Sequence, residues 1–96
     1  MLESTFKLKE REHFESKGWK FIQFNNGAGK GFPDTLCLAP NGYHCFVEWK
    51  QSKTAKKQPL QEFWHDKLNA MGHDAFFVHP ENVNIWRTAV LWKNPK

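Results

Sequence analysis

A predicted β-hairpin in the middle of the chain constrains the fold more than any other feature. Two strand-like segments, residues 34–39 and 43–50, flank the tripeptide Pro-Asn-Gly at 40–42. A two-residue Asn-Gly turn would leave the proline in the ladder, where its missing N–H would be needed. A three-residue loop avoids this, with the proline and asparagine in a type I turn and the glycine left-handed in a bulge. This loop predicts a register in which Ala39 faces Tyr43.

The predicted register brings three charged side chains together. Counting back from the turn, Asp34 falls directly opposite Glu48, and paired residues share one face of a sheet. Lys50 lies two residues further along the same face. A two-residue loop would instead pair Asp34 with Trp49 and turn it away from Glu48. The proline therefore favours a patch of two carboxylates and one lysine at the open end of the hairpin.

Two explanations of this patch remain open on the residues alone. In the first, Lys50 neutralises Glu48 in an isolated salt bridge and Asp34 caps the preceding loop. In the second, the two carboxylates form a site for a hard metal such as Mg²⁺, which takes oxygen ligands and keeps several waters. Lys50 would then orient or deprotonate a water, or stabilise developing negative charge.

Periodicity and turn residues divide the rest of the chain into short elements. The predicted elements are a helix over 2–17, a strand over 19–24, a glycine-rich loop over 25–33, a basic connection over 51–57, a helix capped by Gln58 and opening at Pro59, a strand over 73–79 and a last helix over 80–90. The residues expected on the sheet-facing sides of the first two helices are Phe6, Glu10, His13, Phe14, Leu60, Trp64, Leu68 and Met71. The αβββαβ order, ending in a right-handed parallel crossover, predicts an α/β fold with a mixed sheet of about four strands flanked by helices.

Length and composition indicate one small domain over residues 1–96. The 14 Lys and Arg against 10 Asp and Glu give a formal charge of +4, which favours a polyanionic partner or only reflects a basic surface. Cys37 and Cys45 are expected to be buried thiols, as suits a reducing cytosol. The sequence shows no signal peptide and no long apolar span, so we expect a cytoplasmic protein with no membrane partner.

The order of the charged residues resembles a nuclease signature. The Pro-Asp pair at 33–34, the hairpin and Glu-Trp-Lys at 48–50 are similar to the PD-(D/E)xK motif. Over residues 31–78 the chain reads G-F-P-D, F-V-E-W-K, a helix that opens with glutamine and closes in Leu-x-x-x-Gly, and F-F-V. This succession resembles the VRR-NUC branch of the superfamily in its stand-alone phage or bacterial form. The resemblance implies a restriction-endonuclease-like core and a metal-dependent nuclease.

The resemblance also assigns roles within the charged patch. It implies that Asp34, Glu48 and the backbone carbonyl of Trp49 hold Mg²⁺ or Mn²⁺. It further implies that Lys50 is the catalytic lysine and that Gln61 matches the family's glutamine. Gln61 lies at the edge of the second helix's core stripe and so could reach the patch, although an ordinary exposed glutamine of a first helical turn is the alternative.

A glutamate from the first helix usually joins the site in these nucleases. Glu10 is the candidate here, because it lies between Phe6 and Phe14 on the face that must meet the sheet. Glu3 shares that face but lies near the terminus, and Glu12 points elsewhere. We therefore expect Glu10 to be catalytic, with a solvated helix position as the alternative.

Four lysines outside the patch are expected to contact the DNA backbone. They are Lys30 in the glycine-rich loop and Lys53, Lys56 and Lys57 in the connection that precedes the second helix. A solvated run of charge is the alternative for the last three.

The resemblance implies hydrolysis of phosphodiester bonds in DNA, with four-way (Holliday) junctions as the expected substrate and a homodimer as the expected assembly. Trp86 and Trp92 in the last segment are expected at the dimer interface, unless Trp86 packs on the sheet and Trp92 faces solvent. A flap or nicking endonuclease is one alternative function. A non-catalytic DNA-binding module on a nuclease fold is another, although it would have no need of clustered acids.

Overall fold

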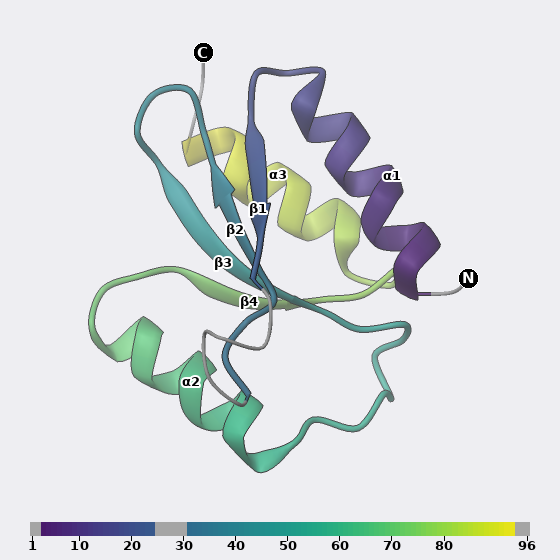
Figure 1. Cartoon of the computed structure of the whole chain (residues 1–96), viewed down its shortest axis with the longest axis vertical. Helices are drawn as coiled ribbons and strands as arrows, with labels where there is room; N and C mark the ends of the chain where they lie inside the picture. The colour runs from purple at the N-terminus through teal and green to yellow at the C-terminus, as the bar shows by residue number, and fades with distance from the viewer. Residues whose placement is uncertain (1–2, 25–30, 94–96) are drawn as a thin grey trace.

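The computed structural model describes residues 3–24 and 31–93, which form three helices and one four-stranded sheet (Figure 1). These elements are α1 (Glu3–Glu15), β1 (Lys20–Gln23), β2 (Thr35–Leu38), β3 (His44–Trp49), α2 (Pro59–Ala70), β4 (Ala75–Val78) and α3 (Val83–Lys93). The predicted order of helices and strands is confirmed, and so is the α/β class. None of the helices in these two ranges is long and apolar enough to cross a membrane.

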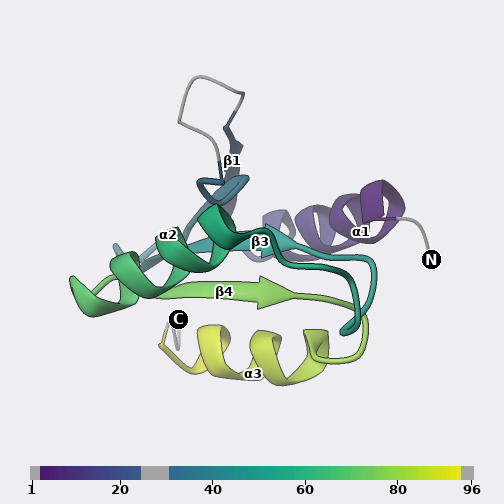
Figure 2. The same cartoon turned by 90° about the horizontal axis from the view of Figure 1, so that it is seen from below.

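The four strands form one mixed sheet in the order β1-β2-β3-β4. β2 pairs antiparallel with both β1 and β3, whereas β4 pairs parallel with β3. In Figure 2, α2 lies on one side of the sheet and α3 on the other. The chain between β3 and β4 passes through α2, as the expected parallel crossover requires.

The hairpin between β2 and β3 has the predicted register. Leu36 pairs with Phe46, and the Ala39 N–H donates to the Tyr43 carbonyl at 2.8 Å. Gly42 closes the three-residue loop with a φ of +98°, the left-handed conformation that a glycine adopts without steric cost. The register that the proline led us to predict is confirmed for the pairs Thr35–Val47 to Leu38–His44.

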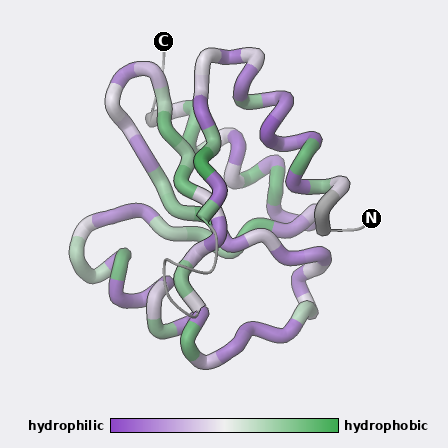
Figure 3. The backbone as a smooth tube through the Cα atoms, in the orientation of Figure 1, coloured by the Kyte–Doolittle hydropathy of each residue, from purple (hydrophilic) through white to green (hydrophobic). Residues whose placement is uncertain are grey.

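The core lies between the sheet and the pair α1 and α3. Its fully buried strand residues include Val47 and Trp49, and Phe14 of α1 packs on Trp86 of α3 with ring centroids 5.0 Å apart. The hydrophobic segments concentrate in the strands, as Figure 3 shows. Trp86 is only 4% exposed, so its expected place at a dimer interface is wrong: it fills the core, while Trp92 is 83% exposed. For Trp86 the structure has the alternative, packing in the core, while the expected interface place of Trp92 stays a prediction.

Helix α2 begins as predicted but turns a different face to the sheet. Gln58 is the N-cap and Pro59 occupies the first turn. Leu68 is buried, whereas Leu60 and Met71 are 46% and 60% exposed, so their expected place in the core stripe is wrong. The helix is rotated because Gln61, and not Leu60, faces the charged residues of β3.

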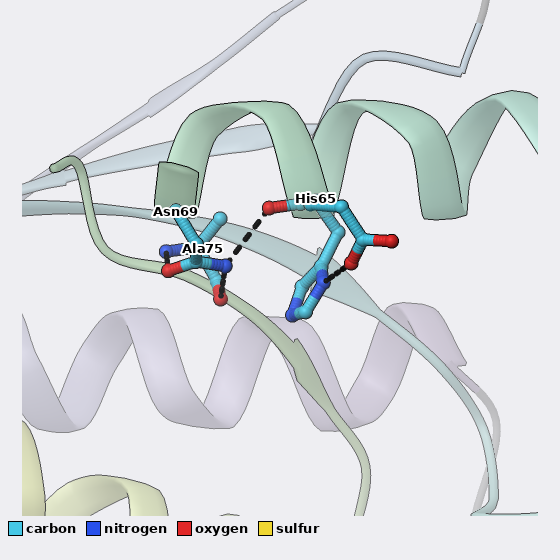
Figure 4. A network of polar contacts seen from close by, with 4 residues as sticks. His65, Asn69 and Ala75 are labelled. Carbon is cyan, nitrogen blue, oxygen red and sulfur yellow. Dashed lines mark hydrogen bonds and ion pairs between the residues drawn. The ribbon is translucent and has the colours of Figure 1, made fainter. Parts of the chain in front are cut away.

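The C-terminal end of α2 is fastened to the start of β4 by a side-chain amide (Figure 4). Asn69 donates to the Ala75 carbonyl at 3.1 Å and accepts from the Ala75 N–H at 3.2 Å. The same amide donates to the His65 carbonyl at 2.8 Å within the helix. Because β4 pairs with β3, this clamp fixes α2 relative to the strand that carries Glu48 and Trp49.

Candidate active site

The open end of the hairpin brings two carboxylates to the α2 side of the sheet. The register of β2 and β3, continued by one position beyond the Thr35–Val47 pair, sets Asp34 opposite Glu48. Both side chains are partly buried. Side chains that face each other across two antiparallel strands lie within about 5.5 Å at Cβ. The observed pairs of β2 and β3 thus have the register from which the convergence was predicted, and the convergence itself stays a prediction.

Gln61 joins Lys50 to Glu48. The Lys50 ammonium donates to Gln61 Oε1 at 2.7 Å, and Gln61 Nε2 donates to Glu48 Oε2 at 3.3 Å. Lys50 is 9% exposed, and its ammonium also donates to the Lys56 carbonyl at 3.3 Å. The predicted reach of Gln61 to the charged patch is thus confirmed. An isolated Lys50–Glu48 salt bridge does not describe this arrangement, because the amide lies between the two charges.

The same amide also starts helix α2. Gln61 Oε1 accepts the backbone N–H of Gln58 at 3.0 Å, which completes a capping box. With two donors on the oxygen, the amide nitrogen has to point away from them, and it points to Glu48. The helix cap therefore sets the orientation of the group that connects Lys50 and Glu48.

Gly31 lets the segment before Asp34 approach the first turn of α2. Its φ is +81°, and a Cβ at this position would lie 2.5 Å from the Cβ of Leu60 and 3.0 Å from the backbone nitrogen of Gln61. Only a glycine fits so close to the helix. The first residue of the G-F-P-D sequence is thus explained by a backbone contact between the two parts of the site.

The donor set suits a hard divalent cation. Mg²⁺ is typically bound by one or two carboxylates and keeps several waters, and Asp34 and Glu48 provide two. In the continued register Trp49 faces Pro33, which has no N–H to give to the Trp49 carbonyl. This carbonyl can therefore serve as an oxygen ligand beside the carboxylates. Among residues 3–24 and 31–93, no three His, Cys, Asp or Glu side chains are grouped to hold a metal ion.

Glu10 is not brought into a group with the two carboxylates. It is 2% exposed and accepts hydrogen bonds from Nε and Nη2 of Arg87 in α3, the first at 2.7 Å. The hydrogen bond to Glu10 raises the pKa of the Arg87 guanidinium. The reason is the packing of α1 with α3 in the core, where Phe14 contacts Trp86. The catalytic role expected for Glu10 stays a prediction, and the side chain of Glu3 lies outside the described part.

Three lysines lie on the connection between β3 and α2. Lys53, Lys56 and Lys57 are exposed, on a segment that is mostly hydrophilic in Figure 3. The Lys57 ammonium lies 4.7 Å from the centre of the Phe77 ring, and Phe77 is the residue of β4 that pairs with Glu48. Lys57 therefore lies beside the strand residue that pairs with Glu48, while Lys30 falls outside the described residues.

Sequence reasoning missed a hydroxyl beneath Asp34. The Thr35 side chain is 2% exposed and contacts both Asp34 and the indole nitrogen of Trp49, each at 2.9 Å. A threonine in a strand is ordinary, so the residue type alone gave no signal. The alternation along the predicted strands did place Thr35 and Trp49 on one face, and it could have suggested the contact.

A nuclease-type domain of the α/β class is what this fold and this cluster define. A solved structure described as "VRR_NUC domain" matches with a TM-score of 0.74 and 28% sequence identity, covering 80% of this chain and 83% of the other. The chain therefore carries the VRR-NUC domain fold that its motifs indicated, and this fold implies a nuclease-type, DNA-processing function. Neither a scan of protein families nor a search of curated proteins found a match.

Proposed function

We propose that this chain is a metal-dependent endonuclease that hydrolyses phosphodiester bonds of branched DNA. The observation that carries the proposal is the hydrogen-bonded series Lys50–Gln61–Glu48 beside Asp34 on a VRR-NUC fold. A structural salt bridge needs no capped glutamine between its partners. A non-catalytic DNA-binding module would gain nothing from two carboxylates facing a phosphate, because they repel it.

The proposed site divides the chemistry between its oxygen ligands and its lysine. Asp34, Glu48 and the Trp49 carbonyl would hold Mg²⁺ or Mn²⁺, which supplies Lewis-acid charge and a more acidic water when bound. The Lys50 ammonium would donate to the phosphoryl oxygens as negative charge develops there. Gln61 keeps that ammonium aimed at the site, because its Oε1 is fixed by the helix cap.

Four-way junctions are the proposed substrate. The proposed active form is a homodimer. The proposed location is the cytoplasm of a bacterial or phage-infected cell. Two active sites related by a two-fold axis suit a substrate that needs symmetric cuts. The exposed Ile85 and Trp92 support a partner surface on α3, because they lie seven residues apart on one side of the helix and are 75% and 83% exposed. A flap or nicking endonuclease is the second candidate, and it needs only one site.

The test is cleavage by the purified protein of a labelled four-way junction, a flap and a linear duplex, with Mg²⁺, Mn²⁺ or a chelator. We expect paired cuts in the junction that require metal. Light scattering at micromolar concentration is expected to give twice the chain mass of 11.3 kDa. A monomer that cuts junctions fully would favour the nicking enzyme, and the absence of cleavage on all three substrates would contradict nuclease function.

A further inference from the structure

A buried hydrogen-bond relay runs from the core to one of the two carboxylates. Trp49 Nε1 donates to Thr35 Oγ1 at 2.9 Å, and the Thr35 hydroxyl donates to Asp34 Oδ1 at 2.9 Å. Thr35 is 2% exposed and Trp49 is fully buried. The relay therefore runs from the aromatic core through Thr35 to the carboxylate of Asp34.

The direction of the relay follows from the groups themselves. An indole nitrogen can only donate a hydrogen bond, and an ionised carboxylate can only accept one. The Thr35 oxygen has to use a lone pair for Trp49, which leaves its own proton for Asp34. Neither end can reverse, so the hydroxyl has one orientation that satisfies both partners.

The donor end of the relay is held in place by aromatic packing. The Trp49 ring contacts Phe6 of α1 at 5.6 Å between centroids, Phe21 of β1 at 6.0 Å and Trp86 of α3 at 5.5 Å. A tryptophan surrounded on these sides has little rotational freedom. The position of Thr35 Oγ1 is thereby set by the core.

The relay is not needed to satisfy the core. Among the described residues, the indole nitrogens of Trp19 and Trp86 are also buried, and they have no hydrogen-bond partner. The fold thus tolerates a buried indole N–H without one. The N–H of Trp49 differs in that its acceptor, the Thr35 hydroxyl, in turn donates to Asp34.

We propose that Thr35 is a positioning residue, which holds the Asp34 carboxylate in its metal-binding orientation through the indole of Trp49. The inference rests on the proposed function, because it takes Asp34 as a metal ligand. Hydrogen bonds to metal-binding groups from outside the ligand set typically change metal affinity or activity by 10- to 100-fold when removed. Thr35→Val removes the relay at nearly constant volume, and Thr35→Ser keeps the hydroxyl.

The experiment measures Mn²⁺ binding by electron paramagnetic resonance and, in parallel, the Mn²⁺ concentration for half-maximal junction cleavage. In Thr35→Val we expect both to weaken by roughly 10- to 100-fold. At saturating metal we expect its kcat to fall while KM for DNA stays unchanged. Thr35→Ser should stay close to wild type, and this rescue separates a hydroxyl effect from a loss of packing.

Two controls keep the inference testable. Thr88→Val makes the same chemical change at an exposed position of α3, where the hydroxyl donates to the Asn84 carbonyl, and it should behave as wild type. If Thr35→Val fails to fold, Trp49→Phe removes the donor while the threonine remains, and it should weaken Mn²⁺ binding by a smaller factor. Unchanged Mn²⁺ binding in every folded relay variant of a metal-dependent wild type would overturn the relay and leave the proposed function intact. A wild type that neither binds Mn²⁺ nor cleaves would overturn the proposed function itself, and the relay with it.

Discussion

The two faces of the sheet differ most clearly along β3. Cys45, Val47 and Trp49 are fully buried against the side of α1 and α3, whereas Phe46 and Glu48 are partly exposed on the side of α2. The period of two in a strand separates these sets completely. One strand therefore supplies a dry core on one face and a polar site on the other.

The helices follow the same division. On one side α1 and α3 contribute Phe6, Phe14, Trp86 and Val90 to the core, all at most 4% exposed. On the other, Leu68 is the buried residue of α2, and Gln61 takes a sheet-facing position. Apolar burial on the first face, at about 25 cal/mol per Å², offsets the cost of keeping charged groups partly buried on the second. The comparison predicts that substitutions on the two faces change different measured quantities.

The largest expected effect is on the α2 face. We predict that Asp34→Asn or Glu48→Gln lowers the cleavage rate at least about 10³-fold, equivalent to about 4 kcal/mol of barrier. Folding should persist and DNA binding should hold or strengthen, because each change removes negative charge near phosphate. Single-turnover cleavage and a DNA titration measure the two. Cleavage surviving in both variants would refute the assignment of the carboxylates.

Lys50→Ala tests whether the ammonium acts in the chemical step. We predict a fall in kcat of about 10²- to 10³-fold, as for loss of one preorganised donor, with little change in affinity for DNA. Rapid-quench kinetics with a separate binding measurement distinguishes the two terms. An affinity that falls in parallel with the rate would make Lys50 only a phosphate contact.

A substitution of Gly31 tests the close contact between the segment before Asp34 and the first turn of α2. Gly31→Ala is expected to cost about 1–2 kcal/mol for its left-handed backbone and about 1–3 kcal/mol more for the contact with Leu60. Gly42→Ala is the matched control, because its φ is also positive but nothing lies within 4 Å of the added Cβ. Denaturant unfolding should rank the two, and cleavage should fall only in the Gly31 variant. Equal stability losses would show that the contact with α2 does not matter.

Val90→Ala tests the core face. It removes two methyl groups from a fully buried position on α3 and is expected to lower the free energy of unfolding by about 2 kcal/mol. Cleavage per folded molecule at low temperature should stay at the wild-type level. A lower rate in the folded protein would mean that the two faces are coupled more strongly than their separate contacts indicate.

The smallest expected effect belongs to the exposed lysines. Replacing Lys53, Lys56 and Lys57 with glutamine should flatten the slope of log affinity against log salt by roughly 0.9 for each lost phosphate contact. The matched control replaces Lys7, Lys9 and Lys17, on the side of α1, with glutamine. It changes the net charge by the same amount. Salt titrations of junction binding compare the two triples. If both triple variants show the same slope, the lysines of the connection do not contact the DNA backbone.

The hairpin and the charged patch could be predicted because they depend on local rules. A proline without an N–H and a glycine with positive φ fix the turn, and the turn fixes which of Asp34, Glu48 and Lys50 share a face. Helix α2 could be placed from Gln58 and Pro59 for the same reason. These residues act on their immediate neighbours in the sequence.

The features that sequence reasoning missed depend on tertiary contacts. The rotation of α2, which exposes Leu60, follows from Gln61 meeting β3, and no helical pattern encodes that contact. The last segment alone is too short to bury Trp86. Its burial depends on contacts with Phe14 of α1 and Trp49 of β3, which are distant in the sequence. Hydropathy ranks a residue as apolar but does not say which of several surfaces will cover it.

The ion pair between Glu10 and Arg87 joins two residues separated by 77 positions in the chain. During synthesis α1 emerges before the sheet and α3 after it, so a carboxylate that ends 2% exposed lacks its partner until α3 is made. Phe14 of α1 likewise lacks its contact with Trp86 until α3 is made. Closure of such distant contacts is slow relative to local structure. The nascent chain therefore keeps α1 incompletely covered until α3 is made, and this core is completed only after β4.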